Sequence, residues 1–569
     1  MNDELQMTEQ PQIQEQERGS DYNEAQRKAI GCETPVAVVE ACAGSGKTRT
    51  IIGRVLHGPC VPSRTAICTF TNAAARVIQD RLAEHNAKVS FAGTIHAWML
   101  RLIRRYHDIA GYGDRISILD ADASDTMLRN IIAEQRYTGT LTAAQEAVKR
   151  GPIIGGKLLT PQEIVAAAYF RKLKMSNLLD FDSILRIGLD LLRNERVIRE
   201  WQWDDCMIDE FQDSTGPLFA IFKALPAKRV MVIGDHCQSI YGFMAACSEN
   251  IQTAKEGATV LRLADNYRCA SSIVEVANRL IKVNGEPGDM VAMPQNGTGR
   301  VILFDGGDEK KEACLIANNI HSLLREDPEM SIAVLVRTNE HRRQISMMLE
   351  GFGVQVEKKA DTIPPPDWSS VKALLAALAD PDNTMACENL IRVWKPAEAK
   401  GIIDNAVANL QSLNESCLHL PYLDLAADAV AFIAQKKPSE ESLKRITDAM
   451  VLSPASDATI ADLQLALSES QEKQETLAGG VAVRTYHSAK GGEWDAVLMP
   501  ALETGIFPSS AEMRTPDTMA EAVRLCYVGV TRARKYLFLS WAGNRRPIWG
   551  GKSEATDPSV FLKYMGFKI

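Results

Sequence analysis

The sequence contains a glycine-rich segment whose residue types suit the binding of a phosphate group. The segment ACAGSGKT covers residues 41–48, between the apolar run VAVVEA and the helical pattern TRTIIGRVL. Glycines let backbone N–H groups turn inward around a phosphate, Lys47 can reach the β and γ oxygens, and the Thr48 hydroxyl can ligate Mg²⁺. We therefore predict a site for a nucleoside triphosphate with Mg²⁺. The residues expected to hold the nucleotide in this segment are Ala43, Gly44, Ser45, Gly46, Lys47, Thr48 and Arg49.

Two acidic residues stand at the end of a second apolar run. In CMIDEFQD, Asp209 can enter the Mg²⁺ shell, while Glu210 can orient or deprotonate an attacking water. Paired acids at a strand end are as often solvated turn residues, but the phosphate segment upstream favours the catalytic interpretation. A third run, VMVIGDHCQSIYG, places the amide of Gln238 where it can sense a γ-phosphate. Together these residues predict phosphoryl transfer to water.

These chemical groups must be positioned by strands, and the apolar runs that precede them are typical of buried parallel strands. The first set of such runs covers residues 36–41, 66–70, 206–210 and 230–235. The second set covers residues 301–304, 332–336, 496–500 and 536–542. Ala, Leu, Glu, Gln and Lys recur at helical spacing at 102–179 and 380–477. The fold class is therefore α/β, with two parallel sheets and one helical insertion in each.

Length and composition indicate several globular domains. The chain has 569 residues, of which 46% are hydrophobic and 24% are charged, close to the averages for soluble globular proteins. Its formal net charge of -8 argues against a protein that coats nucleic acid by bulk charge, so any nucleic-acid contact must be local. The 12 cysteines form no C-x-x-C pair, and no apolar stretch approaches the ~20 residues of a membrane span. We expect a cytoplasmic protein with reduced thiols and no membrane contact.

The order of these segments resembles that of a known family. The phosphate segment, IDEFQD and GDHCQSIYG are similar, in this order, to motifs of the UvrD/Rep/PcrA group of superfamily 1 helicases. Tyr22, Asn23 and Gln26 resemble the family's adenine-reading Q motif. Further resembling segments, in chain order, are TFTNAAA, AGTIHAW, LLDFDSILR, DNYRC, VRTN, TYHSAKGGEWD and YVGVTRAR. The resemblance covers most of the chain.

The resemblance implies a DNA-dependent ATPase that moves 3′ to 5′ on single-stranded DNA and separates duplex DNA. Gln26 is then expected to read adenine, Tyr267 to stack on it, and Glu493 to contact the ribose. Arg268 and Arg532 are expected to reach the γ-phosphate from the second sheet domain, so that hydrolysis requires the two domains to close. The implied catalytic set is Lys47, Glu210, Gln238, Arg268 and Arg532.

The resemblance also names the expected domains as RecA-like. The expected order is a flexible N-terminal tail at 1–20, RecA-like domain 1 at 21–101 and 180–264, its helical insertion at 102–179, RecA-like domain 2 at 265–379 and 478–569, and its short helical insertion at 380–477. The second insertion, at about 100 residues, is shorter than the family leads us to expect.

A local track of donors and aromatic rings is expected to hold the DNA. The side chains expected to stack on bases are Phe70, Trp98, Tyr241 and Phe243. The side chains expected to contact phosphates or sugars are Thr71, Asn72, Thr94, His96, Arg337, Asn339 and His487. A basic cluster at helical spacing, Arg101, Arg104 and Arg105, is either a solvated face or a further DNA contact.

The chain departs from the family pattern in one motif. Where the family usually reads GDDDQSIYGWRGA, this chain reads GDHCQSIYGFMAA, so His236 and Cys237 replace acids, Phe243 replaces Trp and Met244 replaces Arg. A DNA-contacting guanidinium is thereby lost. Two alternatives stay open, the first of them suggested by this altered segment and the short second insertion. One is a nucleotide-gated ATPase subunit that binds a partner nuclease or a repair or replication protein and unwinds poorly alone. The other is a motor of the same superfamily that acts on RNA.

Overall fold

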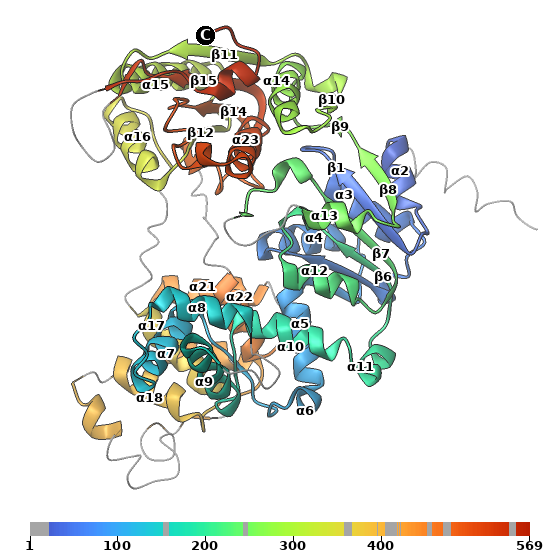
Figure 1. Cartoon of the computed structure of the whole chain (residues 1–569), viewed down its shortest axis with the longest axis vertical. Coiled ribbons are helices and arrows are strands. Elements are labelled where there is room, and N and C mark those ends of the chain that lie inside the picture. The colour runs from blue at the N-terminus through green and yellow to red at the C-terminus, as the bar shows by residue number, and fades with distance from the viewer. Residues whose placement is uncertain are drawn as a thin grey trace, which may run out of the picture.

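The computed structural model places most of the chain in two sheet domains and two groups of helices (Figure 1). The N-terminal tail expected at 1–20 lies outside the residues that the structure describes. The described residues are 22–151, 159–242, 249–357, 367–394, 397–403, 418, 420–421, 423–451, 458–469, 480–545 and 554–569.

The first sheet has six parallel strands in the order β3-β2-β6-β7-β1-β8. The strands are β1 (Val36–Ala41), β2 (Thr65–Thr69), β3 (Phe91–Thr94), β6 (Trp203–Ile208), β7 (Ala227–Gly234) and β8 (Thr259–Leu263). The helices that pack on it or border it are α2 (Glu24–Ile30), α3 (Lys47–His57), α4 (Asn72–Glu84), α5 (Ile95–Arg105), α10 (Phe181–Leu191), α11 (Glu195–Glu200), α12 (Gly216–Lys223) and α13 (Glu249–Ala254). Parallel strands direct their carboxyl ends to one edge of the sheet, where the motif residues therefore gather.

The second sheet has five parallel strands in the order β11-β15-β14-β12-β13. They are β11 (Arg300–Asp305), β12 (Ile332–Val336), β13 (Ala482–Thr485), β14 (Trp494–Met499) and β15 (Ala533–Trp541). Its helices are α14 (Ser271–Ile281), α15 (Glu309–Glu326), α16 (Asn339–Gly351), α23 (Pro516–Val530) and α24 (Val560–Tyr564). The two short strands β9 (Asp265–Asn266) and β10 (Val291–Ala292) pair with each other between the sheets. The expected α/β class with two parallel sheets is confirmed.

Each sheet domain is interrupted by helices that have a hydrophobic core of their own. The first group is α7 (Ala121–Glu134), α8 (Leu141–Arg150) and α9 (Pro161–Met175). The second group is α17 (Trp368–Ala379), α18 (Thr384–Trp394), α20 (Ala426–Gln435), α21 (Glu440–Val451) and α22 (Ile460–Glu469). Helix α17 was expected within the second sheet domain, but its apolar residues pack with the later helices, so this insertion begins before residue 380. The expected boundary after residue 101 likewise falls inside α5, whose apolar face packs on the first sheet.

The two helical groups lie side by side (Figure 1). Helix α22 reaches α5, where Asp462 accepts a bond of 2.9 Å from Arg104. A second ion pair of 2.7 Å joins Lys372 of α17 to Asp120. Gln464 also accepts a hydrogen bond from the backbone N–H of Ile118 in the short strand β4 (Ser117–Ile118). The insertions thus connect the two halves of the chain, and α22 also packs on the core of the first sheet domain through Ala461 and Leu465.

The strands that the sequence missed lie mostly at sheet edges. β3, β8 and β13 were not expected, and they are edge strands of their sheets. Edge strands are short or alternate with polar residues, so they lack the continuous apolar run that marks a central strand. Among the described helices, none combines the length and the apolar character that crossing a bilayer requires.

Candidate active site

The glycine-rich segment forms a tight loop between β1 and the first turn of α3. Gly44 and Gly46 both have positive φ values, +67° and +81°. A Cβ atom at Gly44 would lie 2.7 Å from the Cβ of Arg268, and one at Gly46 would lie 2.9 Å from the Gln26 amide nitrogen. Only glycine fits both positions, because the backbone is left-handed and the neighbours are close. The Ser45 hydroxyl is buried and has no hydrogen-bond partner in the described structure, as expected of a donor kept for a ligand.

Helix α2 contacts this loop through the side chain of Gln26. Gln26 is buried and donates to the Ser45 carbonyl oxygen at 3.1 Å, while its own carbonyl accepts from the Asn23 N–H. Asn23 in turn donates to the Tyr267 hydroxyl at 2.8 Å. The residues expected to read and stack on adenine therefore lie next to one another, although Gln26 already contributes to the loop and to the cap of α2. Arg49 lies over the Tyr22 ring, 5.1 Å from its centroid.

The acid pair follows the carboxyl end of β6, opposite the loop. Glu210 has a left-handed φ of 54°, a strained conformation for a residue with a side chain. The Lys47 ammonium lies 3.4 Å from a Glu210 carboxylate oxygen. Burial raises the pKa of Glu210, but the ammonium groups of Lys47 and Lys490 outweigh it and hold this pKa below its usual range. Burial also lowers the pKa of Lys47, yet the surrounding carboxylates, Glu210 first, raise it overall.

Gln212, which was not predicted from the sequence, bonds to both Glu210 and Asp235. Gln212 is fully buried and donates to the Glu210 carboxylate. Its side-chain carbonyl accepts a bond of 2.9 Å from the Asp235 N–H. Gln212 therefore fixes the loop after β6 against the loop after β7. The signal for it was the Gln of IDEFQD itself, a polar residue two positions after Glu210.

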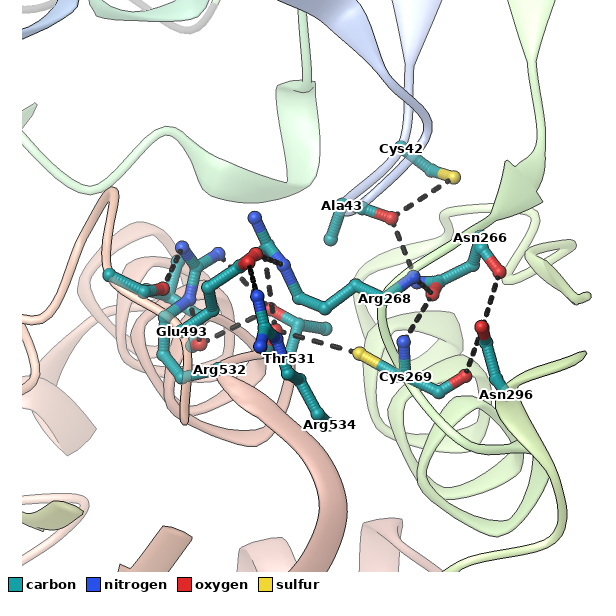
Figure 2. Close-up of polar contacts among 12 residues, drawn as sticks. Cys42, Ala43, Asn266, Arg268, Cys269, Asn296, Glu493, Thr531, Arg532 and Arg534 are labelled. Atoms are coloured by element: carbon teal, nitrogen blue, oxygen red, sulfur yellow. Dashed lines mark hydrogen bonds and ion pairs between the residues drawn. The ribbon is translucent and has the colours of Figure 1, made fainter. Parts of the chain in front are cut away.

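The second sheet domain supplies guanidinium groups to its boundary with the phosphate loop, the region that we call the nucleotide cleft (Figure 2). Arg268 follows β9 and donates to the Glu493 carboxylate at 2.6 Å. Arg534 donates to the other oxygen of Glu493. The carbonyl oxygens of Ala43 and Gly44 accept from Asn266 at 2.8 Å and from the Tyr267 N–H at 2.9 Å, so this segment grips the phosphate loop directly.

Arg532 meets Gln238 across the cleft. Its guanidinium is buried, donates to Val528 and Gly492 carbonyl oxygens, and donates to the Gln238 side-chain oxygen at 3.0 Å. Burial and the neighbouring Arg268 lower the pKa of Arg532 to about 10. Two of the expected catalytic residues, one from each sheet domain, are thus in contact.

Lys490 is a second functional residue that the sequence reading missed. It lies in TYHSAKGGEWD of the second sheet domain and forms an ion pair of 2.5 Å with Asp213, three residues after Glu210. It also donates to the Gln238 backbone carbonyl at 3.1 Å and lies 4.8 Å from the centroid of the Tyr241 ring. Burial raises the pKa of Asp213 to about 6, although Lys490 acts in the opposite direction. Lys490 therefore contacts both the nucleotide cleft and an expected DNA platform.

The residues expected to bind Mg²⁺ fit that ion chemically. The Thr48 hydroxyl and the Asp209 carboxylate offer the hard oxygen ligands that Mg²⁺ prefers. Burial and the adjacent Glu210 carboxylate raise the pKa of Asp209, so a nearby divalent cation would stabilise its ionised form.

The expected DNA contacts of the first sheet domain follow the adjacent strands β2 and β3. Thr71 is exposed and caps α4, and the buried Asn72 amide nitrogen has no hydrogen-bond partner in the described part of the chain. Thr94 is only 1% exposed and accepts a bond of 3.1 Å from the Ala97 N–H, so its hydroxyl caps α5. Burial lowers the pKa of His96 to about 4, and its ring packs on Phe181. Phe70 packs partly on the sheet core.

The expected contacts of the second sheet domain follow its adjacent strands β12 and β13. Arg337 forms an ion pair with Glu512 at 2.6 Å. Burial, together with Arg337, lowers the pKa of His487 to about 4, and the His487 ring lies 6.4 Å from the Tyr241 ring. Asn339 is exposed at the start of α16. Tyr241 and His487 thus bring the two domains together at this edge.

One expected base platform is wrong and another is not described. Trp98 is fully buried in the core, 4.6 Å between ring centroids from Trp203, so it cannot stack on a base. Trp98 lies on the buried hydrophobic face of α5. Phe243 lies outside the described residues.

The basic cluster of α5 is divided among three partners and is not one continuous face. Arg101 lies over an aromatic ring, Arg104 forms an ion pair, and Arg105 lies over another ring. The partners are, in that order, Phe91, Asp462 and Trp201.

Two family descriptions match the sequence. Residues 22–259 match the UvrD/REP helicase N-terminal domain. Residues 261–425 and 424–544 match the UvrD-like helicase C-terminal domain. Together the matches extend over most of the chain.

Several proteins named ATP-dependent DNA helicase PcrA are similar to the chain along most of its length. The protein of Leuconostoc citreum is 27% identical, over 95% of this chain and 84% of its own. That of Bacillus subtilis (strain 168) is 25% identical, over 95% of this chain and 85% of its own. That of Staphylococcus aureus (strain COL) is 23% identical, over 95% and 86%. With the two family matches, these similarities establish that the chain belongs to the UvrD/Rep/PcrA-like family of superfamily 1, the UvrD-like ATP-dependent DNA helicases.

Proposed function

We propose that the protein hydrolyses ATP to move 3′ to 5′ along single-stranded DNA and unwinds duplex DNA ahead of it. The observation that carries this proposal is the contact of Arg532 with Gln238, beside the Lys47–Glu210 pair. A cleft that joins the two sheet domains in this way is closed only when the domains approach, so nucleotide binding and domain movement are coupled.

The residues of the first sheet domain prepare the reaction. Backbone N–H groups of the loop at residues 43–48 and the Lys47 ammonium hold the phosphates. Glu210 then orients the attacking water and accepts its proton, and the ammonium groups that lower its pKa keep it ionised for this role. Mg²⁺, held by Thr48 and Asp209, would neutralise charge on the phosphate oxygens.

The residues of the second sheet domain complete the site. Arg268 and Arg532 are proposed to stabilise the charge that develops on the γ-phosphate, with Gln238 sensing it. Arg268 must exchange its Glu493 partner for phosphate oxygens, which leaves Glu493 paired with Arg534 and one carboxylate oxygen available to the ribose. The nucleotide thus replaces a contact within the second sheet domain by contacts that reach the phosphate loop of the first.

The proposed DNA path crosses both sheet domains at the carboxyl ends of their strands. Tyr241 and His487 would contact bases or sugars, and Thr71, Asn72, Arg337 and Asn339 the backbone. We place the protein in the cytoplasm, which agrees with the ten described cysteines being free thiols.

Strand displacement by the isolated chain tests this function. The substrates are duplexes with a 3′ tail, with a 5′ tail and with a fork, each with and without Mg²⁺-ATP. We expect ATP-dependent separation of the 3′-tailed and forked duplexes, and none of the 5′-tailed duplex.

Two outcomes would contradict the proposal. Separation of the 5′-tailed duplex alone would reverse the direction. DNA-stimulated ATP turnover without separation of any duplex would favour the alternative, an ATPase subunit that needs a partner nuclease or repair protein.

A further inference from the structure

The one-turn helix η3 (His236–Gln238) carries both the γ-phosphate sensor and the chain's departure from its family pattern. His236 stands where the family usually has an acid. Its Nδ1 lies 2.7 Å from an Oε1 atom of Glu286, and both side chains are largely shielded from solvent. An imidazole N–H can donate to a carboxylate, whereas an ionised aspartate there would repel it.

Glu286 belongs to the second sheet domain. It follows α14 and the turn η5 (Lys282–Asn284), and α14 packs in the core of the second sheet. Asn284 donates to the Ala520 carbonyl oxygen at 2.9 Å and so fastens this loop to α23. The hydrogen bond from His236 holds the pKa of Glu286 below its usual range, although burial opposes this. The contact therefore spans the two sheet domains.

Hydrogen bonds within the η3 turn and to Asp235 fix the position of Gln238 close to His236. Gln238 donates to Asp235 through its side chain at 2.6 Å and through its backbone N–H at 2.8 Å. The Asp235 carboxylate also caps the turn by accepting from the Cys237 N–H at 3.0 Å. These bonds tie together Asp235, Cys237 and Gln238, the residues on both sides of His236, so a displacement of His236 is expected to displace Gln238.

Other residues of the second domain hold the same loop further along. Arg524 of α23 donates to the Ser239 carbonyl oxygen at 2.7 Å, and Arg532 reaches the Gln238 side chain. Arg524 also lies near Glu286 and helps to lower the pKa of that carboxyl. Through His236, the η3 turn is also bonded to Glu286 in the loop after α14.

We propose that the His236–Glu286 pair is an interdomain strut that positions Gln238 for the γ-phosphate. The inference rests on the proposed ATP hydrolysis. The strut favours the approach of the two domains before ATP contributes, so ATP binds a cleft that is already partly closed.

A charge exchange tests the strut. His236→Asp places a carboxylate against Glu286, and His236→Asp/Glu286→Lys restores an attractive pair. A cavity of about 30 Å³ adjoins both side chains, so the shorter Asp creates no steric conflict. The matched control is Glu275→Gln, which removes an exposed ion pair with Arg279 on α14, in the same domain.

The steady-state kinetics of ATP hydrolysis, measured with saturating (dT)-oligonucleotide, give the first readout. We expect His236→Asp to raise KM for ATP by about 10-fold with kcat changed by less than about 2-fold, because a smaller fraction of the protein is closed. The double variant should return KM to within about 2-fold of the wild type, and Glu275→Gln should leave it unchanged. An unchanged KM in His236→Asp, or no recovery in a double variant with normal thermal stability, would overturn the strut.

A second readout does not depend on hydrolysis. Dyes placed through unnatural amino acids at the exposed Glu84 of α4 and Glu350 of α16 report the distance between the two sheet domains by energy transfer. His236→Asp should lengthen this distance without ATP, and the double variant should restore it; an equal distance in all variants would overturn the inference. Loss of ATP turnover in the wild type itself would instead refute the proposed function.

Discussion

The nucleotide cleft and the proposed DNA track lie at the same ends of the same two sheets, yet their side chains are engaged differently. In the cleft, the expected residues contact one another, as Lys47 contacts Glu210 and Arg532 contacts Gln238. In the track, the expected residues contact the fold, as Thr94 caps α5 and Arg337 pairs with Glu512.

This difference indicates how each site works. The pairs Lys47–Glu210 and Arg532–Gln238 are arranged before the ligand arrives, which lowers the reorganisation that catalysis needs, and only Arg268 of the expected catalytic residues must exchange a side-chain partner. A track residue such as Arg337 must give up a partner inside the protein when DNA binds, which keeps its contact with DNA weak. A motor that releases its strand at every step needs this weakness, so changes in the cleft should remove activity and changes in the track should adjust affinity.

The largest effect is expected from the cleft. Lys47→Ala and Glu210→Gln should each lower DNA-stimulated ATP turnover by about 10³-fold or more, because phosphate charge is no longer neutralised or water no longer activated. Turnover is measured by phosphate release with single-stranded DNA present. Binding of single-stranded DNA should remain within about 3-fold of the wild type, since neither side chain lies in the track. Full turnover by either variant would remove the assigned roles.

A smaller effect is expected where the two regions meet. Lys490→Met removes the ion pair with Asp213 and the contact with the Tyr241 ring, so DNA binding should stimulate ATP hydrolysis less. The ratio of ATP turnover with DNA to turnover without it should fall by about 10-fold, as expected for the loss of a charge-assisted contact. Lys490→Arg, which keeps the charge, should recover most of the ratio. If the Met and Arg variants behave alike, Lys490 does not connect the two regions.

Changes within the track should be modest and can have either sign. Arg337→Ala should weaken binding of single-stranded DNA by about 3-fold and reduce the salt dependence by about one phosphate contact. Glu512→Gln should strengthen binding, because it releases Arg337 from its partner inside the protein. Fluorescence anisotropy over a series of salt concentrations measures both. Weaker binding in Glu512→Gln would show that Glu512 orients Arg337 for DNA and does not compete with it.

The smallest functional effect is expected at Thr94. Because its buried hydroxyl caps α5, Thr94→Ala should lower the free energy of unfolding by about 1 kcal/mol and change DNA affinity little. The matched variant is Thr71→Ala, which removes the exposed cap of α4. It should change the free energy of DNA binding more than the free energy of unfolding. Urea unfolding and anisotropy on both variants separate the two roles. A larger DNA effect for Thr94→Ala would contradict the structural role.

The same contrast explains what could be predicted from the sequence. The central strand β12 matches the expected run 332–336, because a buried parallel strand is a continuous apolar run. The edge strand β3 was missed, since FAGT is short and lacks that run. In the cleft, the chemistry of a phosphate dictates residue types, so Lys47 and Glu210 could be found from local patterns.

Other parts of the site depend on contacts between distant parts of the chain. The partner of Lys490, Asp213, lies 277 residues away, and no local pattern reveals that pairing. Trp98 was expected to stack on a base as an aromatic residue of the segment AGTIHAW, but the apolar face of α5 buries it. Aromatic and hydroxyl side chains serve the fold as readily as a ligand, so the track was harder to predict than the cleft.

The central claim, that DNA in the track controls chemistry in the cleft, is tested most directly by ATP turnover of the wild-type chain without nucleic acid, with a single-stranded DNA oligonucleotide and with an RNA of the same sequence. We expect DNA to raise kcat by at least about 10-fold and RNA to raise it far less. Equal turnover under all three conditions would contradict the coupling, and stronger stimulation by RNA would contradict the assignment to DNA.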